Sequence, residues 1–379
     1  MMSRALKSSR VIRYDNISDV HTNHPRTKSI FKGLRESFKP GPELAALDMI
    51  MIHGDFFDSP VGMGSDTTQD FDTWAKEFLT NCKRHDVIVR ILEGTPSHDW
   101  WQSYRFVFLN ELMQIGCDVR YFDTLSIEYI ERLDLHVLYV PDEYRPTPEE
   151  TLAEVKDLMA ARGLTQVDIA SMHGVFDFQL PPNVKGHKHD SSEYLKLVRY
   201  AIHIGHHHIK NKYKHIFAQG SFDRLSHNEE GAKGKVRTTI YTGSGEVEWE
   251  FIENKLATKY LTIDCVDLDI QAAIDKAGAV AATLAEGFIR LSAYTDSPIF
   301  SNMVQFTMFW PHIVWSKHPV ERPGEAPQEF DVFDDEEDFS APITISKDNV
   351  LSLLMPRITS RATSVEMIKM VEEAIKELA

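Results

Sequence analysis

The sequence of 379 residues contains few cysteines and no long apolar run. Its three cysteines, Cys82, Cys117 and Cys265, stand far apart and form no C-x-x-C pair. This spacing argues against a disulfide framework and against a thiolate zinc site, so we interpret them as buried thiols. No stretch has the length and hydrophobicity of a membrane span, and residues 1–13 lack the apolar core of a signal peptide. We therefore expect a cytoplasmic protein without membrane contact.

Basic residues are also scarce for a protein that would bind nucleic acid. The chain has 41 Lys and Arg against 57 Asp and Glu, a formal net charge of −16, whereas surfaces that bind phosphate backbones are normally basic. Half of this excess lies between Glu321 and Pro342, where nine acidic residues accompany a single base. Because that segment has the composition of a solvated linker, the acidic total does not exclude a DNA-binding surface elsewhere.

Short β-rich runs alternate with helical patterns over the first two thirds of the chain. The expected strands are 11–17, 47–52, 87–92, 167–171 and 200–204, and the expected helices are 68–84, 100–115 and 148–161. A hairpin at 127–140 adds an antiparallel pair. This order predicts an α/β fold, a mixed-sheet sandwich flanked by helices, in which ligands bind beyond the carboxyl ends of the strands.

Five fragments with metal-binding side chains follow these strands in a fixed order. They are Ser18-Asp19-Val20-His21, Gly54-Asp55-Phe56-Phe57-Asp58, Ser97-His98-Asp99, Met172-His173-Gly174 and Gly205-His206-His207-His208. Imidazole and carboxylate ligands suit manganese, iron or zinc better than calcium. Two such ions that share a carboxylate can activate water for attack on a phosphoester. The fragments therefore predict a two-metal, phosphoester-cleaving centre with six firm ligand candidates: Asp19, His21, Asp55, His173, His206 and His208.

His98 is the candidate for a catalytic residue that does not bind metal. An imidazole beside a dinuclear centre can hydrogen-bond the phosphate and help to protonate the leaving alkoxide, and Asp99 is placed to fix its tautomer. We interpret His53 and His203 as structural, and Asp58 as a hydrogen-bond partner rather than a ligand.

Three aromatic residues follow this catalytic loop directly. Trp100, Trp101 and Tyr104 either stack on an unpaired base or form the core of a helix.

The order D-x-H, G-D-x-x-D, H-D, H, G-H-x-H resembles the calcineurin-like metallophosphoesterases. Within these, 54–59, 219–225 and Lys233-Gly234 are similar to the SbcD-type nucleases of bacteria and phages, and the resemblance spans roughly residues 10–265. It implies two ligand sets that share one carboxylate. The first is Asp19, His21, Asp55 and His208, and the second is Asp55, the residue at position 97, His173 and His206.

Ser97 departs from the family pattern, which has an asparagine ligand before the catalytic histidine. The loop Gly94-Thr95-Pro96-Ser97-His98 is also longer by two residues. A hydroxyl is a weaker ligand than an amide carbonyl. The sequence thus leaves open whether Ser97 binds the second ion, whether water replaces it, or whether that ion arrives with substrate.

The sequence pattern changes after about residue 245, where a β-β-α-β order predicts a small separate α+β domain, and the resemblance implies roles for the resulting parts. Residues 1–245 would form the nuclease domain and 246–320 a small α+β capping domain that selects DNA ends. Residues 321–345 would be the acidic linker, and 346–379 a helical segment that docks on an SbcC-type ATPase.

The leading functional prediction is a DNA nuclease subunit that uses two divalent ions, with Mn²⁺ favoured, and that acts with this ATPase partner at DNA ends in recombination and repair. One alternative is a dinuclear-metal phosphodiesterase or phosphatase acting on nucleotides or phosphoproteins. Another is a non-catalytic scaffold subunit of an ATPase complex. A homodimer, the polarity of cleavage and the choice between exonuclease and endonuclease remain open.

Overall fold

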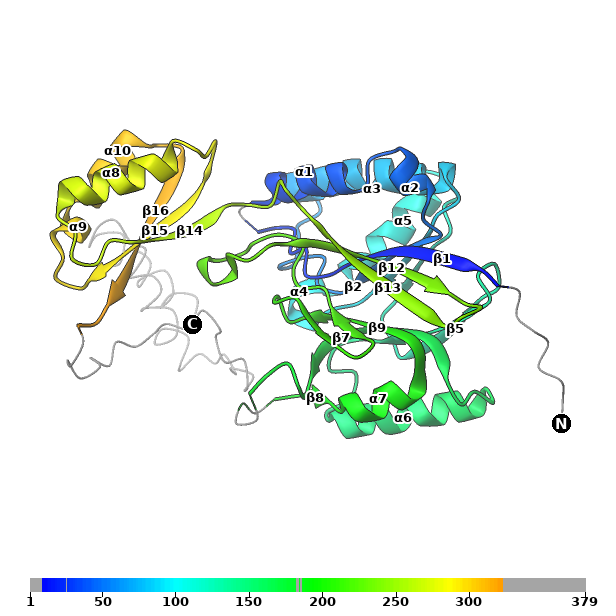
Figure 1. The fold of residues 1–379 in the computed structure, drawn as a ribbon. Coiled ribbons are helices and arrows are strands. Elements are labelled where there is room, and N and C mark those ends of the chain that lie inside the picture. Colours follow the sequence, from blue (N-terminus) through cyan, green and yellow to red (C-terminus); the bar gives the residue numbers. More distant parts are fainter. Residues whose placement is uncertain (1–8, 25, 182–183, 185, 323–379) are drawn as a thin grey trace, which may run out of the picture. The chain divides into compact units, whose positions relative to one another are not determined.

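A computed structural model describes residues 9–24, 26–181, 184 and 186–322 (Figure 1). The helix expected at 346–379 and nearly all of the acidic linker at 321–345 lie outside these residues. No helix in the described ranges is both long enough and apolar enough to cross a membrane.

The first layer of the fold is a six-stranded sheet. Its strands, in spatial order, are β13 (Glu246–Glu253), β12 (Gly234–Tyr241), β1 (Val11–Ile17), β2 (Met49–His53), β3 (Ile88–Leu92) and β4 (Val119–Phe122). Strands β1 to β4 are parallel, and β12 and β13 complete the sheet in antiparallel pairing. The helices on its outer face are α1 (Thr27–Ser37), α2 (Pro42–Ala45), α3 (Asp66–Arg84) and α5 (Arg105–Leu112) (Figure 1). Their aromatic residues, including Phe31, Trp74 and Phe106, pack on Ile50 and Ile52 of the sheet.

A second mixed sheet packs against the inner face of the first. Its strands, in order, are β10 (Asn211–Tyr213), β11 (Ile216–Ala218), β9 (Val198–His206), β7 (Val167–Phe176), β6 (Leu135–Val140) and β5 (Ser126–Ile130), and β8 (Lys188–His189) pairs with β7. Its outer face carries α6 (Pro148–Ala161) and α7 (Ser191–Leu197). Tyr14 and Met51 of the first sheet meet Val137, Tyr139 and Ile169 of the second in a shared core. The predicted mixed-sheet sandwich flanked by helices is confirmed, as is the hairpin at 127–140.

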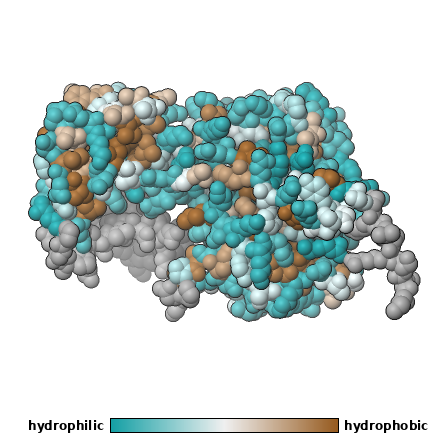
Figure 2. Space-filling model, in the orientation of Figure 1, coloured by the Kyte–Doolittle hydropathy of each residue, from teal (hydrophilic) through white to brown (hydrophobic). Residues whose placement is uncertain are grey.

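The remaining described residues form a small α+β unit. Its parallel strands are β14 (Tyr260–Asp264), β15 (Gly287–Tyr294) and β16 (Ile313–Val320), and its helices are α8 (Ile270–Ala281), α9 (Pro298–Ser301) and α10 (Met303–Phe309). Figure 2 shows apolar surface on this unit, where Val304, Met308 and Phe309 are more than half exposed.

This unit begins later in the chain than the sequence predicted. The expected boundary at residue 246 is wrong, because β13 pairs with β12 along its whole length and belongs to the first sheet. The short connection at 242–245, which ends at Gly245 with a positive φ of 78°, favours local hairpin pairing of these two strands.

Candidate metal centre

The loops after β1 and β2 run side by side and bring three of the predicted ligands together. The amide of Asp19 donates to the Gly54 carbonyl (3.1 Å), and the amides of Val20 and His21 donate to the Asp55 carbonyl (2.8 and 3.1 Å). Asp19, His21 and Asp55 all adopt left-handed φ values, of 50°, 51° and 50°. Such a conformation costs a non-glycine residue roughly 1–3 kcal/mol and is concentrated at functional sites. Here it turns all three side chains into one space.

Two glycines allow the surrounding elements to approach this space. A Cβ at Gly54, where φ is 86°, would overlap the His173 ring and the Gly94 backbone. A Cβ at Gly205 would overlap the His53 carbonyl and would lie 2.8 Å from the His173 ring. Both positions therefore require glycine for close packing of the two sheets at their carboxyl edges.

The second sheet supplies three imidazoles. His173 lies within β7, which extends beyond the predicted end at 171 to Phe176, and His206 is the last residue of β9. These strands are neighbours, with His173 opposite Gly205 and Gly174 opposite His206. His208 follows two residues later and faces the first sheet. The structure thus brings together all six of the firm ligand candidates.

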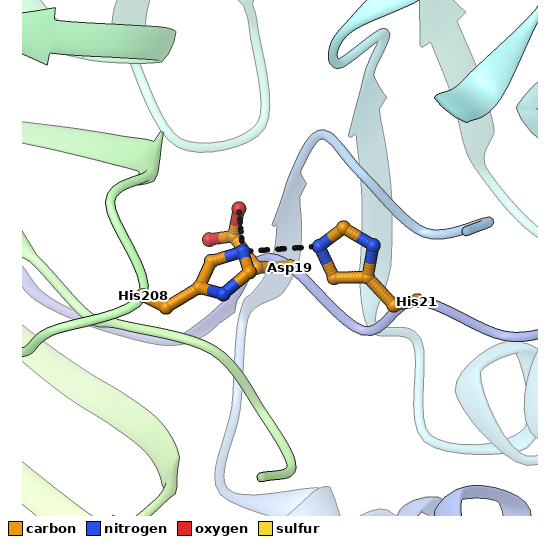
Figure 3. A group of neighbouring side chains, drawn as sticks. All are labelled: Asp19, His21 and His208. Atoms are coloured by element: carbon orange, nitrogen blue, oxygen red, sulfur yellow. Dashed lines mark hydrogen bonds and ion pairs between the residues drawn. The ribbon is translucent and has the colours of Figure 1, made fainter. Parts of the chain in front are cut away.

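Asp19, His21 and His208 form the first of the groups that could hold a metal ion (Figure 3). The two Nε2 atoms of His21 and His208 face each other at 3.1 Å, and His208 Nε2 lies 3.8 Å from Asp19 Oδ1. Asp19 Oδ1 accepts a hydrogen bond from the amide of His206 (2.8 Å). Asp19 Oδ2 is buried and has no hydrogen-bond partner among the described residues. An unpaired buried carboxylate oxygen beside two facing imidazole nitrogens is a donor set that fits a divalent cation.

Further side chains fix the two imidazoles of this group. Glu229 Oε1 lies 2.8 Å from His208 Nδ1, and Lys233 donates to Glu229 Oε2 (2.8 Å). Asp58 Oδ1 lies 3.3 Å from His21 Nδ1, within ion-pair distance of the ring. Burial would raise the pKa of Glu229, but His208 and Lys233 together lower it. The carboxylate therefore stays charged and directs His208 Nε2 into the site.

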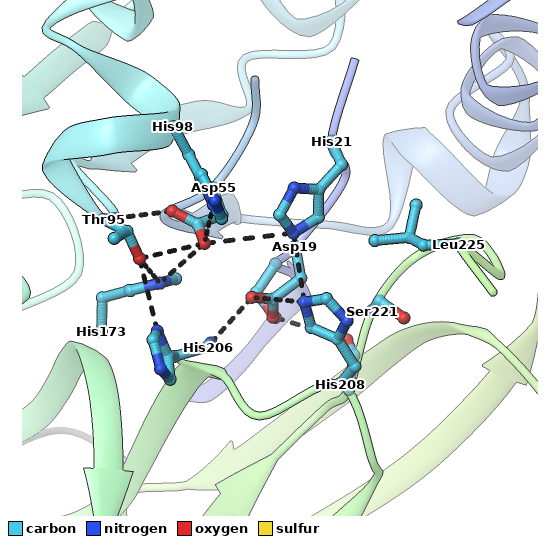
Figure 4. A network of polar contacts seen from close by, with 12 residues as sticks. Asp19, His21, Asp55, Thr95, His98, His173, His206, His208, Ser221 and Leu225 are labelled. Atoms are coloured by element: carbon cyan, nitrogen blue, oxygen red, sulfur yellow. Dashed lines mark hydrogen bonds and ion pairs between the residues drawn. The ribbon is translucent and has the colours of Figure 1, made fainter. Parts of the chain in front are cut away.

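Asp55, His173 and His206 form a second group, and Asp55 joins the two (Figure 4). Its Oδ2 lies 3.3 Å from His173 Nε2, 3.0 Å from His98 Nδ1 and 4.0 Å from His21 Nε2. Burial would raise the pKa of Asp55, but the surrounding histidines lower it well below its usual range. One charged oxygen shared among three imidazoles has the geometry of a bridging ligand.

The loop after β3 differs from its expected arrangement. Thr95, rather than Ser97, faces the cluster formed by the two candidate metal groups. Thr95 Oγ1 lies between 3.1 and 3.4 Å from Asp142 Oδ2, Asp55 Oδ2, His206 Nδ1 and His173 Nε2. Ser97 is exposed, because Pro96 begins the helical turn α4 (Pro96–Asp99) and this turn directs Ser97 to solvent. Thr95 precedes the turn in an extended conformation and points inward.

His98 occupies the position predicted for it, but Asp99 does not support it. His98 Nδ1 contacts Asp55 Oδ2, and 38% of its side chain is exposed. The hydrogen bond to Asp55 raises the pKa of His98. The fully buried Asp99 accepts hydrogen bonds from the amides of Phe57 and Gly94 (both 2.9 Å) instead. Successive side chains in a helical turn point about 100° apart, so Asp99 fixes the loop backbone while His98 faces the cluster.

The aromatic residues after α4 are exposed rather than part of a helix core. Trp100 and Trp101 are each 58% exposed and have left-handed φ values of 44° and 58°. Glu93 Oε1 accepts a hydrogen bond from the Trp101 amide (2.6 Å), which stabilises the turn at these two residues. The predicted helix at 100–115 is therefore shorter, and α5 begins only at Arg105. Arg105 is paired with Asp72.

A buried polar layer lies directly beneath the cluster, between the two sheets. The His53 carbonyl is 2.6 Å from His173 Nδ1, and the His53 ring stacks on His203 at 5.4 Å between centroids. The Tyr14 hydroxyl lies 3.1 Å from His203 Nε2. Burial lowers the pKa of His203 to about 3, so it is neutral in the folded protein. Both histidines have the structural position expected for them.

Two acidic residues near the cluster were missed in the sequence. Asp142 follows β6 and contacts Thr95 and His206, and Glu229 supports His208. Glu229 pairs with Lys233 four residues later, but that spacing predicts pairing only within a helix and residues 230–233 are not helical, so the sequence offered no signal for it.

Comparisons with known proteins add little to this geometry. No protein-family model matches the chain, and no curated protein matches it. One solved structure aligns with 64% of this chain and along 99% of its own length, with a TM-score of 0.36 and 9% sequence identity. Another, TT1561 of Thermus thermophilus, has the same coverage, a TM-score of 0.37 and 8% identity. Likenesses at these scores carry no argument about function, which must come from the site itself.

Proposed function

We propose that this chain is a metal-dependent phosphodiesterase that cleaves DNA, similar to the SbcD-type nucleases. The observation that supports this most strongly is Asp55 Oδ2, which faces the His21, His98 and His173 imidazoles at once. The two residue groups that share Asp55 would hold two divalent ions, with manganese favoured, and such ions would supply a polarised water molecule and positive charge for the phosphate.

His98 has the geometry of a proton donor in this reaction. Its Nδ1 is fixed by Asp55, and the partial exposure of its ring leaves the other nitrogen free to reach a bound phosphodiester. The partly exposed imidazole is placed to give a proton to the leaving alkoxide, which requires one. His98 would therefore hydrogen-bond the phosphate and protonate the departing oxygen.

The exposed aromatic residues support a nucleic-acid substrate. A hollow of about 360 Å³ beside the catalytic loop is lined in part by Trp101, Tyr104 and Phe108. Aromatic faces bind unpaired bases without sequence preference, at about 1–3 kcal/mol for each stacked base. Together with the metal cluster, this surface favours DNA with unpaired or frayed ends. An SbcC-type ATPase partner belongs to the same proposal and rests on the sequence resemblance.

The test is cleavage of end-labelled duplex and single-stranded DNA by the purified full chain with Mn²⁺. We expect degradation that stops on chelation and falls at least about 10³-fold in Asp55→Asn, because both ions lose their shared ligand. Asp157→Asn, an exposed carboxylate on α6, is the matched control and should retain activity. Robust cleavage by Asp55→Asn would overturn the proposal.

Two simple esters separate DNA cleavage from the alternative activities. Turnover of p-nitrophenyl phosphate without hydrolysis of bis-p-nitrophenyl phosphate or DNA would favour a phosphatase acting on nucleotides or phosphoproteins. Two bound ions without turnover of any ester would favour a scaffold subunit.

A further inference from the structure

Asp142 is a buried carboxylate at the edge of the second metal group that none of the sequence motifs includes. It is the second residue after β6, following Pro141, and is 7% exposed. Strand β6 is the parallel neighbour of β7, which in turn neighbours β9. Asp142, His173 and His206 therefore come from the same edge of three adjacent strands, where side chains converge.

The local backbone fixes the direction of this carboxylate. The amide of Glu143 donates to Asp142 Oδ1 (3.0 Å), which leaves Oδ2 facing the cluster. Gly174 in β7 has a φ of 125°, and a Cβ there would lie 3.2 Å from Asp142 Oδ1. A larger residue at 174 would crowd the carboxylate, so the site is built to admit it.

Asp142 Oδ2 faces the same small space as the second metal group. It lies 3.1 Å from Thr95 Oγ1 and 3.5 Å from His206 Nδ1. The Thr95 hydroxyl is also 3.2 Å from Asp55 Oδ2. A hydroxyl has a single proton and can donate to only one of these two carboxylates. Two buried carboxylates and two imidazoles thus lie within 3.4 Å of the Thr95 hydroxyl, and this gathering of acidic and imidazole groups favours a cation beside it.

We propose that Asp142 is a ligand of the second metal ion, completing a set with Asp55, His173 and His206. It would supply the oxygen that the exposed Ser97 does not, and it would add a negative charge where an amide ligand adds none. The added carboxylate makes this set harder and better suited to manganese. This inference rests on the proposed two-metal function.

The test is a titration of metal-free protein with Mn²⁺. Binding is measured by calorimetry and by the electron paramagnetic resonance signal of the unbound ion. Wild type should bind two ions. In Asp142→Asn one ion should keep its affinity and the other should bind at least about tenfold more weakly. Asn keeps an oxygen that can accept a hydrogen bond from His206 or Thr95, so this variant separates a charged ligand from a merely positioning group. Weakening in Asp142→Ala but not in Asp142→Asn would overturn the proposal.

Asp123→Asn is the matched control, because Asp123 is an exposed carboxylate on the same pocket wall as Asp142. Asp123→Asn should bind both ions as tightly as wild type does. If Asp123→Asn and Asp142→Asn weakened Mn²⁺ binding equally, the effect of Asp142 would be one of general charge, and it would not be a ligand. Wild type that binds fewer than two ions would instead count against the proposed function.

A Mn²⁺-soaked crystal of wild type gives a readout that needs no variant. An Asp142 oxygen about 2–2.5 Å from the ion is expected, and one beyond about 3 Å would refute the assignment.

Discussion

The two halves of the candidate metal centre, Asp19-His21-His208 and Asp55-His173-His206, are linked by Asp55 but are supported differently. In the first half, Asp58 stands behind His21 and Glu229 behind His208. In the second half, His173 is backed by a backbone carbonyl, and 41% of the His206 side chain is exposed. A carboxylate behind a ligating imidazole fixes its ring and raises its basicity. We therefore expect the first half to bind its ion more tightly and the more open second half to exchange its ion more readily.

After Asp55→Asn, the largest expected effect concerns His98, which contacts the shared Asp55 and is a ligand of neither half in the proposed function. His98→Gln should lower kcat for DNA about 10²–10³-fold, because proton donation to the leaving oxygen is lost. Mn²⁺ titration should still find two ions. His85→Gln, at the end of α3, is the matched control and should cleave normally. Loss of an ion in His98→Gln would show that His98 is itself a ligand.

An intermediate effect should follow from removing the support of the first half alone. Glu229→Gln removes the charge that holds His208 Nδ1 and leaves Lys233 without its buried counter-ion. We expect one Mn²⁺ to bind about 10–100-fold more weakly and the other to be unaffected. The exposed Glu253→Gln on β13 serves as the control. If both ions weakened equally, the two halves would not be independent as described.

The smallest effect concerns the polar layer beneath both halves. The pKa of His203 is about 3 in the folded protein, below the ordinary value of 6.5, so the unfolded chain takes up the proton first as the pH falls. The stability from neutral His203 is complete above pH 6.5 and declines between 6.5 and about 3. At pH 5.5 the loss is about 1 kcal/mol relative to pH 7.

Denaturant unfolding of metal-free protein at pH 7 and 5.5 measures this loss. His203→Gln should be less stable than wild type at pH 7 and should lose less stability on acidification. If wild type and His203→Gln lost the same unfolding free energy between pH 7 and 5.5, His203 would not cause this pH dependence.

The sequence was sufficient for the local part of this architecture. Asp19, Asp55 and His206 each follow or end a β-rich run, and parallel strands bring their carboxyl ends to one edge, so clustering could be predicted from order alone. The same rule placed His173 correctly even though β7 continues past it. The mixed-sheet sandwich followed from the alternation of strands and helices.

The parts that could not be predicted depend on contacts between distant segments or on side-chain direction within a loop. Asp142 reaches the cluster because β6 neighbours β7, and no spacing in the sequence encodes that pairing. Thr95 and Ser97 are chemically alike, and only the turn begun by Pro96 determines which hydroxyl points inward. Strand β13 was assigned to the small unit because its pattern does not reveal its partner β12.

The left-handed backbone at four of the proposed ligands affects how well the folded loops resist proteolysis. Asp19, His21, Asp55 and His206 all have positive φ. Glycine would relieve the strain at each position but would remove the donor side chain. Bound ions favour the folded loops by mass action and so offset this deficit. Protease resistance of the loops after β1, β2 and β9 should therefore depend on the divalent ion, which would make cellular lifetime as well as activity a function of metal supply.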